Sequence, residues 1–424
     1  MLRNNGTCKP IAASRRLASA VVIGIAALLC GAAPGRAQDP VALAQEHLYA
    51  GTLAAGETAL AALSERSPAD DNARFGLAGV QFMRAVERLG QALYRHGLEA
   101  PRSGLVPILR LPVPRNPRPA PLTYEGFRAI LQNFVDDLAR VDATLGEGGL
   151  AQAKLPIDLA RIRLDLNGDG TVADDELFWN ILAGVDPRAR GAKPESFVAA
   201  FDAGDAHWLK GYTHLLRGIG EFWLAHDFRP MFDQAFQLFF PRAQLPFAPP
   251  RPRTPGSDGM ASEYPSIADA IALIHLWNWP VAEPERLPRV VAHLKAMAEQ
   301  SRKSWAAILA ETDDDQEWIP SPRQTSRFPD LPVTQERVDA WLAVMAELDA
   351  VVDGRKLVPH WRFEKGINLR RAILEHKNFD LVMWLTGAGV MPFLEDGAAV
   401  SSESWDQMVR AFEGNFFGYA IWFN

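Results

Sequence analysis

Apolar residues recur at helical spacing through most of this chain, in blocks separated by proline-rich segments. In the first block, Leu60, Leu63, Phe82 and Val86 are among the side chains that fall on helical faces. A helix with this pattern buries one stripe of side chains against a neighbour. We therefore predict a mainly α fold, built of helical hairpins or a bundle and containing few short strands.

The first block also contains a spacing that resembles a helical repeat. Pro68 and Pro101 lie 33 residues apart, which is close to the tetratricopeptide period, and small Ala and Gly residues between them are similar to that repeat. Two ordinary helical hairpins would give the same pattern. The N-terminal part is thus weakly similar to tetratricopeptide proteins, with simple hairpins as the alternative.

A chain of 424 residues can form one large or two modest domains. We predict a helical domain over 38–243, a linker rich in Pro, Gly and Ser over 244–259, and a second helical domain over 260–424. Segment 195–228 is expected to be helical, whereas the prolines of 101–122 exclude a helix there. In the second domain we expect helices over 266–279, 284–311, 334–352, 367–375, 380–385 and 404–416.

Residues 1–37 have the pattern of a secretory signal peptide. Basic residues that include Arg15 and Arg16 precede an apolar run over 17–33, and we expect cleavage after Ala37. A retained membrane anchor is the alternative, and the paired arginines leave twin-arginine export open beside the general route. The sequence therefore predicts a periplasmic or secreted protein with no membrane span after cleavage.

Composition narrows the chemistry of the mature chain. Its two cysteines, Cys8 and Cys30, both precede the expected cleavage site, so neither a disulfide nor a thiolate site is expected. Removal of the first 37 residues leaves 39 basic against 51 acidic side chains, with no long basic stripe. Because phosphate binding requires concentrated positive charge, we do not expect nucleic acid as a partner.

The segment DLNGDGTVADDE, residues 165–176, carries oxygen-bearing residues at alternating positions. Alternate side chains can converge on one point, while Gly170 permits the positive φ that a sharp turn requires. Calcium prefers six to eight oxygen ligands, and this spacing suits it better than magnesium or zinc. The expected ligands are Asp165, Asn167, Asp169, the backbone carbonyl of Thr171, and Glu176.

These twelve residues and the segment after them resemble an EF-hand loop with its exiting helix. The entering side departs from the family, because Pro156 leaves little room for a helix and Ile162 and Leu164 alternate as in a strand. Ala173 occupies a ligand position but cannot coordinate, so a water would replace it. The resemblance to a single, dockerin-like loop implies a structural Ca²⁺ site rather than a paired sensor, and an empty acidic turn is the alternative.

Three other features are candidates for chemistry. The acidic run 311–318 contains Asp313 and Asp315, which could bind metal or act in hydrolysis, although a solvated loop explains them as well. His207 and His214 lie two helical turns apart, too far for one metal without a third element. The aromatic run at the C-terminus is expected to dock into the core.

Two functions therefore stay open. The first is an exported calcium-binding protein with a non-enzymatic binding or scaffold role, whose helical surface contacts a protein partner. The alternative is a periplasmic hydrolase with an acidic, aromatic-lined pocket that uses residues 313–315 or the region of His207. No nucleophile-elbow, zinc-protease or phosphate-loop motif is present, so no catalytic residue can be assigned from the sequence.

Overall fold

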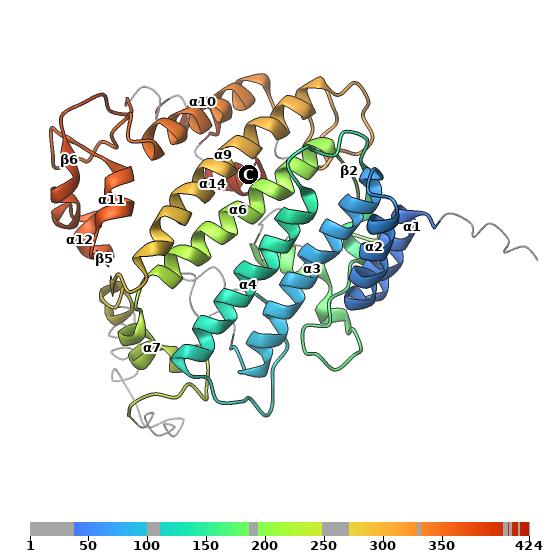
Figure 1. Cartoon of the computed structure of the whole chain (residues 1–424), viewed down its shortest axis with the longest axis horizontal. Helices are drawn as coiled ribbons and strands as arrows, with labels where there is room; N and C mark the ends of the chain where they lie inside the picture. The colour runs from blue at the N-terminus through green and yellow to red at the C-terminus, as the bar shows by residue number, and fades with distance from the viewer. Residues whose placement is uncertain are drawn as a thin grey trace, which may run out of the picture. The chain divides into compact units, whose positions relative to one another are not determined.

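The mainly α fold predicted from the sequence is confirmed. The computed structural model describes residues 38–99, 111–185, 194–247, 271–328, 332–401, 406, 409–413 and 416–423. Figure 1 shows the long helices α3, α4, α6 and α9 side by side, with α1 and α2 beside α3 and with α10 next to α9. The signal peptide predicted over 1–37 lies outside the described residues, as does most of the predicted linker.

The bounds of the elements follow in chain order. The α-helices are α1 (Pro40–Ala50), α2 (Leu53–Arg66), α3 (Asp71–Arg95), α4 (Tyr124–Leu145), α5 (Phe178–Val185), α6 (Ala203–Ala225), α7 (Arg229–Ala235), α9 (Leu287–Ala310), α10 (Gln335–Val352), α11 (Leu369–Glu375), α12 (Leu381–Leu385) and α14 (Phe416–Phe423). The strands are β1 (Lys154–Asp158), β2 (Val198–Asp202), β3 (Asn278–Pro280), β4 (Gly366–Ile367), β5 (Asn378–Asp380) and β6 (Leu394–Glu395), which form the antiparallel pairs β1–β2, β3–β5 and β4–β6.

Local capping explains where the long helices begin. The side chains of Asp70, Thr123 and Thr334 each accept a hydrogen bond from a backbone N–H in the first turn of α3, α4 and α10. An N-cap oxygen of this kind satisfies one of the amide groups that has no partner within the helix. Helix α1 ends at Gly51, whose φ of 70° places it in the left-handed region that glycine adopts readily.

Two predictions of secondary structure are wrong in part. Segment 198–202 is strand β2 rather than the start of a helix, and 278–280 is strand β3 rather than the end of one. The described residues after Pro68 contain the single helix α3 of 25 residues, which favours simple hairpins over a tetratricopeptide repeat at this place. Short apolar runs fit a helix and a strand equally well. Whether such a run becomes a strand therefore depends on whether another segment pairs with it.

The described parts of both predicted domains share one hydrophobic core. Residues 39–424 form one compact unit, in which α6 packs along α9. Trp279 is fully buried, and its ring lies 4.7 Å from that of Trp223 in α6. The terminal aromatic run docks into this core, with Trp422 and Phe423 of α14 buried. Within the described residues, no helix is both long and apolar enough to cross a membrane.

Candidate functional site

The loop 165–176 is organised by hydrogen bonds from backbone amides to its acidic side chains. Asp165 Oδ1 accepts from the N–H groups of Gly168 and Asp169 at 2.7 and 3.1 Å, and its Oδ2 accepts from Gly170 at 3.0 Å. Asp169 Oδ1 accepts from the amide and hydroxyl of Thr171 at 2.8 and 2.6 Å. These bonds to Thr171 lower the pKa of Asp169, so its carboxyl stays ionised.

Glu176 closes the loop from its far end. Its side chain is fully buried, with Oε1 accepting from the amide of Asn167 at 3.0 Å and Oε2 from that of Ala173 at 2.9 Å. Gly168 and Gly170 take φ values of 74° and 81°, the left-handed conformation that a turn of this sharpness requires. The chain therefore folds back so that Glu176, the last expected ligand, lies against the turn that contains Asp165, Asn167 and Asp169.

Helix α3 holds the loop in place. Glu87 accepts a hydrogen bond from the amide of Asp165 at 2.9 Å, and Gln91 donates to the carbonyl of Asp165 at 2.8 Å. A Cβ atom at Gly90 would lie 2.5 Å from Leu166, so glycine allows α3 to approach the loop closely. The loop is therefore a fixed part of the bundle.

The segments that flank the loop differ from a helix pair. Strand β1 and a short 3-10 helix (Leu159–Arg161) precede the loop in place of an entering helix, for which Pro156 leaves little room. The exiting helix is α5. Backbone bonds from Leu164 to Glu176 and from Phe178 to Ile162, both 3.0 Å, join the two flanks as a short antiparallel ladder.

An apolar cavity of about 330 Å³ lies next to these flanks. Aromatic side chains gather in its wall, including Trp208 and Tyr212 of α6, whose rings stack 5.4 Å apart. Asp205 is the one charged residue in the wall, and no histidine lines it within the described residues. The remaining lining residues come from α1, α3, α4, β1, β2, α5 and α6, from Leu111, Leu159 and Ile162, and from Trp318 and Trp422.

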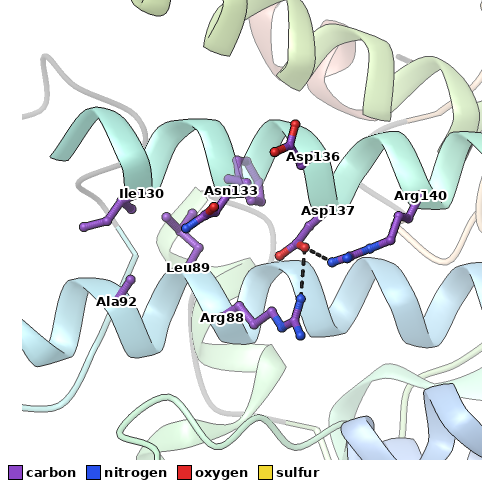
Figure 2. Close-up of a pocket in the computed structure, with 9 residues that line it drawn as sticks. Arg88, Leu89, Ala92, Ile130, Asn133, Asp136, Asp137 and Arg140 are labelled. Carbon is purple, nitrogen blue, oxygen red and sulfur yellow. Dashed lines mark hydrogen bonds and ion pairs between the residues drawn. The ribbon is translucent and has the colours of Figure 1, made fainter. Parts of the chain in front are cut away.

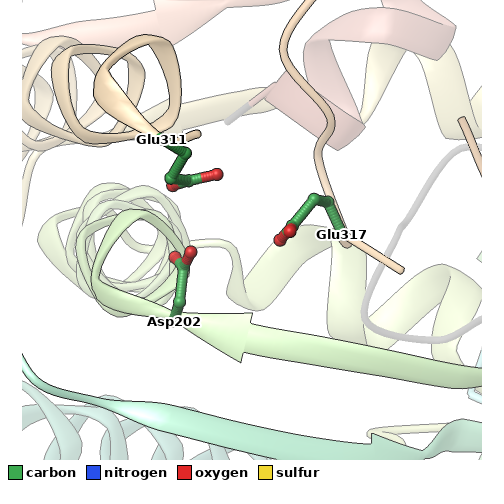
Figure 3. A group of neighbouring side chains, drawn as sticks. All are labelled: Asp202, Glu311 and Glu317. Carbon is green, nitrogen blue, oxygen red and sulfur yellow. The ribbon is translucent and has the colours of Figure 1, made fainter. Parts of the chain in front are cut away.

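Three acidic side chains meet near one end of that cavity, at the junction of β2 and α6. Asp202, Glu311 and Glu317, which we call the acidic cluster, each offer a carboxylate oxygen, and these oxygens lie within 4.8 Å of one another. Figure 3 shows the three side chains turned toward a common space from β2, from the end of α9 and from the segment after it. Among the described acidic residues and histidines, no such group includes Asp165, Asp169 or Glu176.

The carboxyl groups of Glu311 and Glu317 hold their protons more tightly than ordinary glutamates do. Burial raises the pKa of Glu311 to about 8 and that of Glu317 to about 7, and the charge of Asp202 adds to both shifts. Burial also raises the pKa of the neighbouring Asp205 well above its ordinary value, and the charges of the cluster add to it. None of these four carboxyl groups forms an ion pair with a Lys, Arg or His of the described chain.

The other candidates from the sequence have ordinary structural partners. Lys154 Nζ donates to Asp313 Oδ2 at 2.9 Å and also pairs with Asp315, and all three side chains are about half exposed. His207 Nδ1 lies 2.8 Å from Gln300 Oε1. Asp313 and Asp315 therefore pair with a lysine. The sequence did not indicate the acidic cluster, because Asp202 lies more than 100 residues before Glu311.

Two buried histidines form a direct pair. His226 Nε2 lies 2.7 Å from His376 Nε2, and the Nδ1 atoms contact the carbonyls of Phe222 and Ala372. Burial lowers the pKa of His226 to about 4 and also lowers that of His376. Burial therefore disfavours the charged form of both rings in the folded protein.

This pair predicts a loss of stability in acid. Unfolded histidine takes up a proton near pH 6.5, whereas the folded His226 resists it down to about pH 4. The contribution is present above pH 6.5 and falls as the pH drops, by roughly 2 kcal/mol at pH 5 for His226. Urea unfolding from pH 7 to 4 should show this slope, and the double variant His226→Phe/His376→Phe should flatten it. An unchanged slope in that variant would exclude the pair as its source.

A second hollow of about 430 Å³ lies between α3 and α4. Figure 2 shows Arg88 and Arg140 both directed at Asp137, which is 7% exposed. Arg88 Nη1 lies 3.1 Å from Asp137 Oδ1, and Arg140 pairs with the same oxygen. Asp136 also lines the hollow, so its two arginines and two aspartates balance one another in charge.

Comparison with known proteins adds no relative. The chain matches no family model, no curated protein and no solved structure. The loop 165–176, the apolar cavity and the acidic cluster are therefore the features from which function can be inferred.

Proposed function

We propose that this is an exported protein that binds calcium in the loop 165–176 and holds a small apolar molecule in the adjoining cavity. The function is binding rather than catalysis. One observation carries the proposal: the cavity wall includes Ile162 from the segment before the loop and Phe178 from the helix after it. The predicted calcium site thus joins two parts of one ligand-binding wall.

The cavity determines what kind of molecule would fit. A volume of about 330 Å³ is at the small end of the usual range for small-molecule sites, roughly 300–1,000 Å³. Its wall is almost entirely aliphatic and aromatic. An apolar molecule gains free energy on leaving water for such a wall, whereas a polar molecule would lose hydrogen bonds to water that the wall cannot replace. We therefore expect a compact hydrophobic or aromatic compound rather than a sugar or a charged metabolite.

Calcium would act on this cavity through the backbone. Phe178 N–H donates to the carbonyl of Ile162 at 3.0 Å, directly beyond the loop that Asp165 and Glu176 close. A cation bound within the loop would fix the separation of these two segments. Because coupling between two binding sites is reciprocal, the apolar ligand should raise the affinity for calcium by the same factor.

Filling the cavity tests the proposed ligand site. Gly79 lies in α3 and lines the cavity, and a Cβ atom there would meet nothing within 4 Å. The substitution Gly79→Leu should occupy part of the cavity, leave too little space for the neutral probe N-phenyl-1-naphthylamine, and lower the affinity for that probe at least tenfold. Fluorescence titration of the purified protein measures this change. The helix should become more stable, because interior glycine costs about 0.5–1 kcal/mol relative to alanine.

The matched control is Gly79→Ala, which adds one methyl group and should leave most of the probe binding intact. Its stability should rise as in the leucine variant, so the two substitutions differ mainly in the volume that they fill. Equal probe binding by wild type and Gly79→Leu would place the apolar ligand elsewhere and remove the main support for this function.

A further inference from the structure

The acidic cluster joins residues that no local motif connects. Asp202 is the N-cap of α6, Glu311 follows the last turn of α9, and Glu317 lies on the segment after it. Glu317 is 4% exposed, so its carboxyl group has little access to water. Carboxylates that are brought together in this way repel one another unless protons or a cation intervene.

Asp205 provides a second and independent observation. Its side chain is 3% exposed, and its Oδ1 atom accepts no hydrogen bond from the described residues. Its other oxygen, Oδ2, accepts from the amide of Asp202 at 3.1 Å, so the Asp205 carboxyl group lies beside the first member of the acidic cluster. A buried polar atom without a partner costs about 1–3 kcal/mol, which a bound ligand would recover.

The hydrogen bonds of these residues follow one pattern. Asp202 Oδ1 accepts from Gly204 N–H at 2.7 Å, and Asp205 Oδ2 accepts from the Asp202 amide at 3.1 Å.

Glu311 and Glu317 are held in the same way. Glu311 Oε2 accepts from Gln324 Nε2 at 3.2 Å, and Glu317 Oε1 accepts from the Asp315 amide at 3.1 Å. In each acidic residue one oxygen is thus fixed by an amide. Apart from the contact between Asp202 and Glu311, the second oxygen has no donor among the described residues.

Gly204 lies close to the acidic cluster, and its lack of a side chain leaves space there. A Cβ atom at Gly204 would lie 2.9 Å from Ile308, 3.3 Å from Asp202 Oδ1 and 3.4 Å from Glu311 Oε1. A larger residue at this position would clash with Ile308 and would crowd the carboxylate of Asp202. Glycine in the first turn of α6 therefore leaves room beside the neighbouring oxygens.

We propose that Asp202, Glu311 and Glu317, with Asp205 beside them, form a second cation site, which binds a divalent cation of the calcium class independently of the loop 165–176. Carboxylate oxygen is the ligand that hard cations prefer, and amide bonds to the outer oxygens would orient the ligands. Several acidic ligands around one ion suit calcium, which accepts six to eight oxygens, better than the rigid octahedral magnesium ion.

The rival explanation is a shared proton. Asp202 and Asp205 form a capping box at the start of α6, and a proton between Asp202 and Glu311 would relieve part of the repulsion. That arrangement would bind no cation. Calcium binding by the purified protein therefore separates the two explanations.

The test counts bound calcium by equilibrium dialysis and calorimetry. We expect two calcium ions per chain in wild type, one in Glu317→Gln, one in Glu176→Gln and none in the double variant. Asp313→Asn is the matched control, because Asp313 lies on the same segment but pairs with Lys154, and it should leave both sites intact. Two ions in Glu317→Gln, or a single ion in wild type that Glu176→Gln removes, would overturn this second site.

Terbium luminescence gives a readout that does not depend on stoichiometry. In the Glu176→Gln background, Tb³⁺ bound at the acidic cluster should be sensitised by Trp318, the next residue after Glu317. Adding Glu317→Gln should remove at least nine-tenths of that emission while the near-ultraviolet circular dichroism stays unchanged, and unchanged emission would overturn the proposal. A single calcium ion that Glu317→Gln removes and Glu176→Gln does not would support this site and refute the calcium loop.

Discussion

Trp279→Ala should destabilise the whole helical bundle by about 3–5 kcal/mol, the usual cost of truncating a buried large aromatic residue. Trp279 is fully buried and packs against side chains from both halves of the chain. Its ring centre lies 4.7 Å from Trp223, 5.8 Å from Phe228 and 6.2 Å from Phe379. No nearby side chain can fill a cavity of that size without moving these rings.

The same variant tests whether the two halves fold together. Since α6 packs along α9 and Trp279 contacts α6, its loss should accelerate hydrogen exchange in α3 and α4 as well as in α9. Urea unfolding followed by hydrogen exchange and mass spectrometry measures both effects. Trp361→Ala is the matched control, because that tryptophan is 75% exposed and its loss should cost within about 0.5 kcal/mol. Unchanged protection of α3 and α4 in Trp279→Ala would support two independently folding domains.

The structure shows how far a single sequence can be interpreted. Helix starts were predictable where a local cap signals them: Thr334 caps α10, whose predicted range of 334–352 agrees with the structure within one residue. Strand β2 was not predictable, because its partner β1 lies about 40 residues earlier and only that pairing distinguishes FVAAFD from a helical turn. Local chemistry thus determines helix ends, whereas long-range pairing determines the short strands.

The two candidate cation sites also differ in whether local sequence or long-range packing brings their residues together. All expected ligands of the loop lie within twelve consecutive residues, so spacing alone indicates them. The acidic cluster needs α6 and α9 to pack before Asp202 can approach Glu311, and no spacing in the sequence records that approach. The sequence did identify the run 311–318 as acidic, but it favoured Asp313 and Asp315, which pair with Lys154.

Both candidate cation sites adjoin the apolar cavity. The loop connects Ile162 to Phe178 in one wall, while Asp205 and Trp318, beside the acidic cluster, line another. If both sites bind calcium, removal of both ions would loosen two walls of the cavity at once. The affinity for an apolar ligand should then fall more in chelator than after the loss of either site alone.

Glu176→Gln should weaken the protein in two separable ways. In chelator, the glutamine can offer only one acceptor oxygen to the amides of Asn167 and Ala173, so one of these partly buried hydrogen bonds is lost. That loss should cost about 1–3 kcal/mol. In calcium at 100 times the dissociation constant, the variant should also lack the roughly 2.7 kcal/mol that a bound ion adds.

Thermal and urea unfolding in chelator and in millimolar calcium separates these two terms. The comparison is best made in a Glu317→Gln background, in which calcium at the acidic cluster no longer contributes. Asp175→Asn is the matched control, because Asp175 is an exposed acidic residue in the same loop at a position that supplies no ligand. It should keep both the stability in chelator and the response to calcium. If calcium fails to stabilise the parent, while Glu176→Gln still lowers stability in chelator, the loop is a hydrogen-bonded turn in which Glu176 acts only as an acceptor of backbone amides.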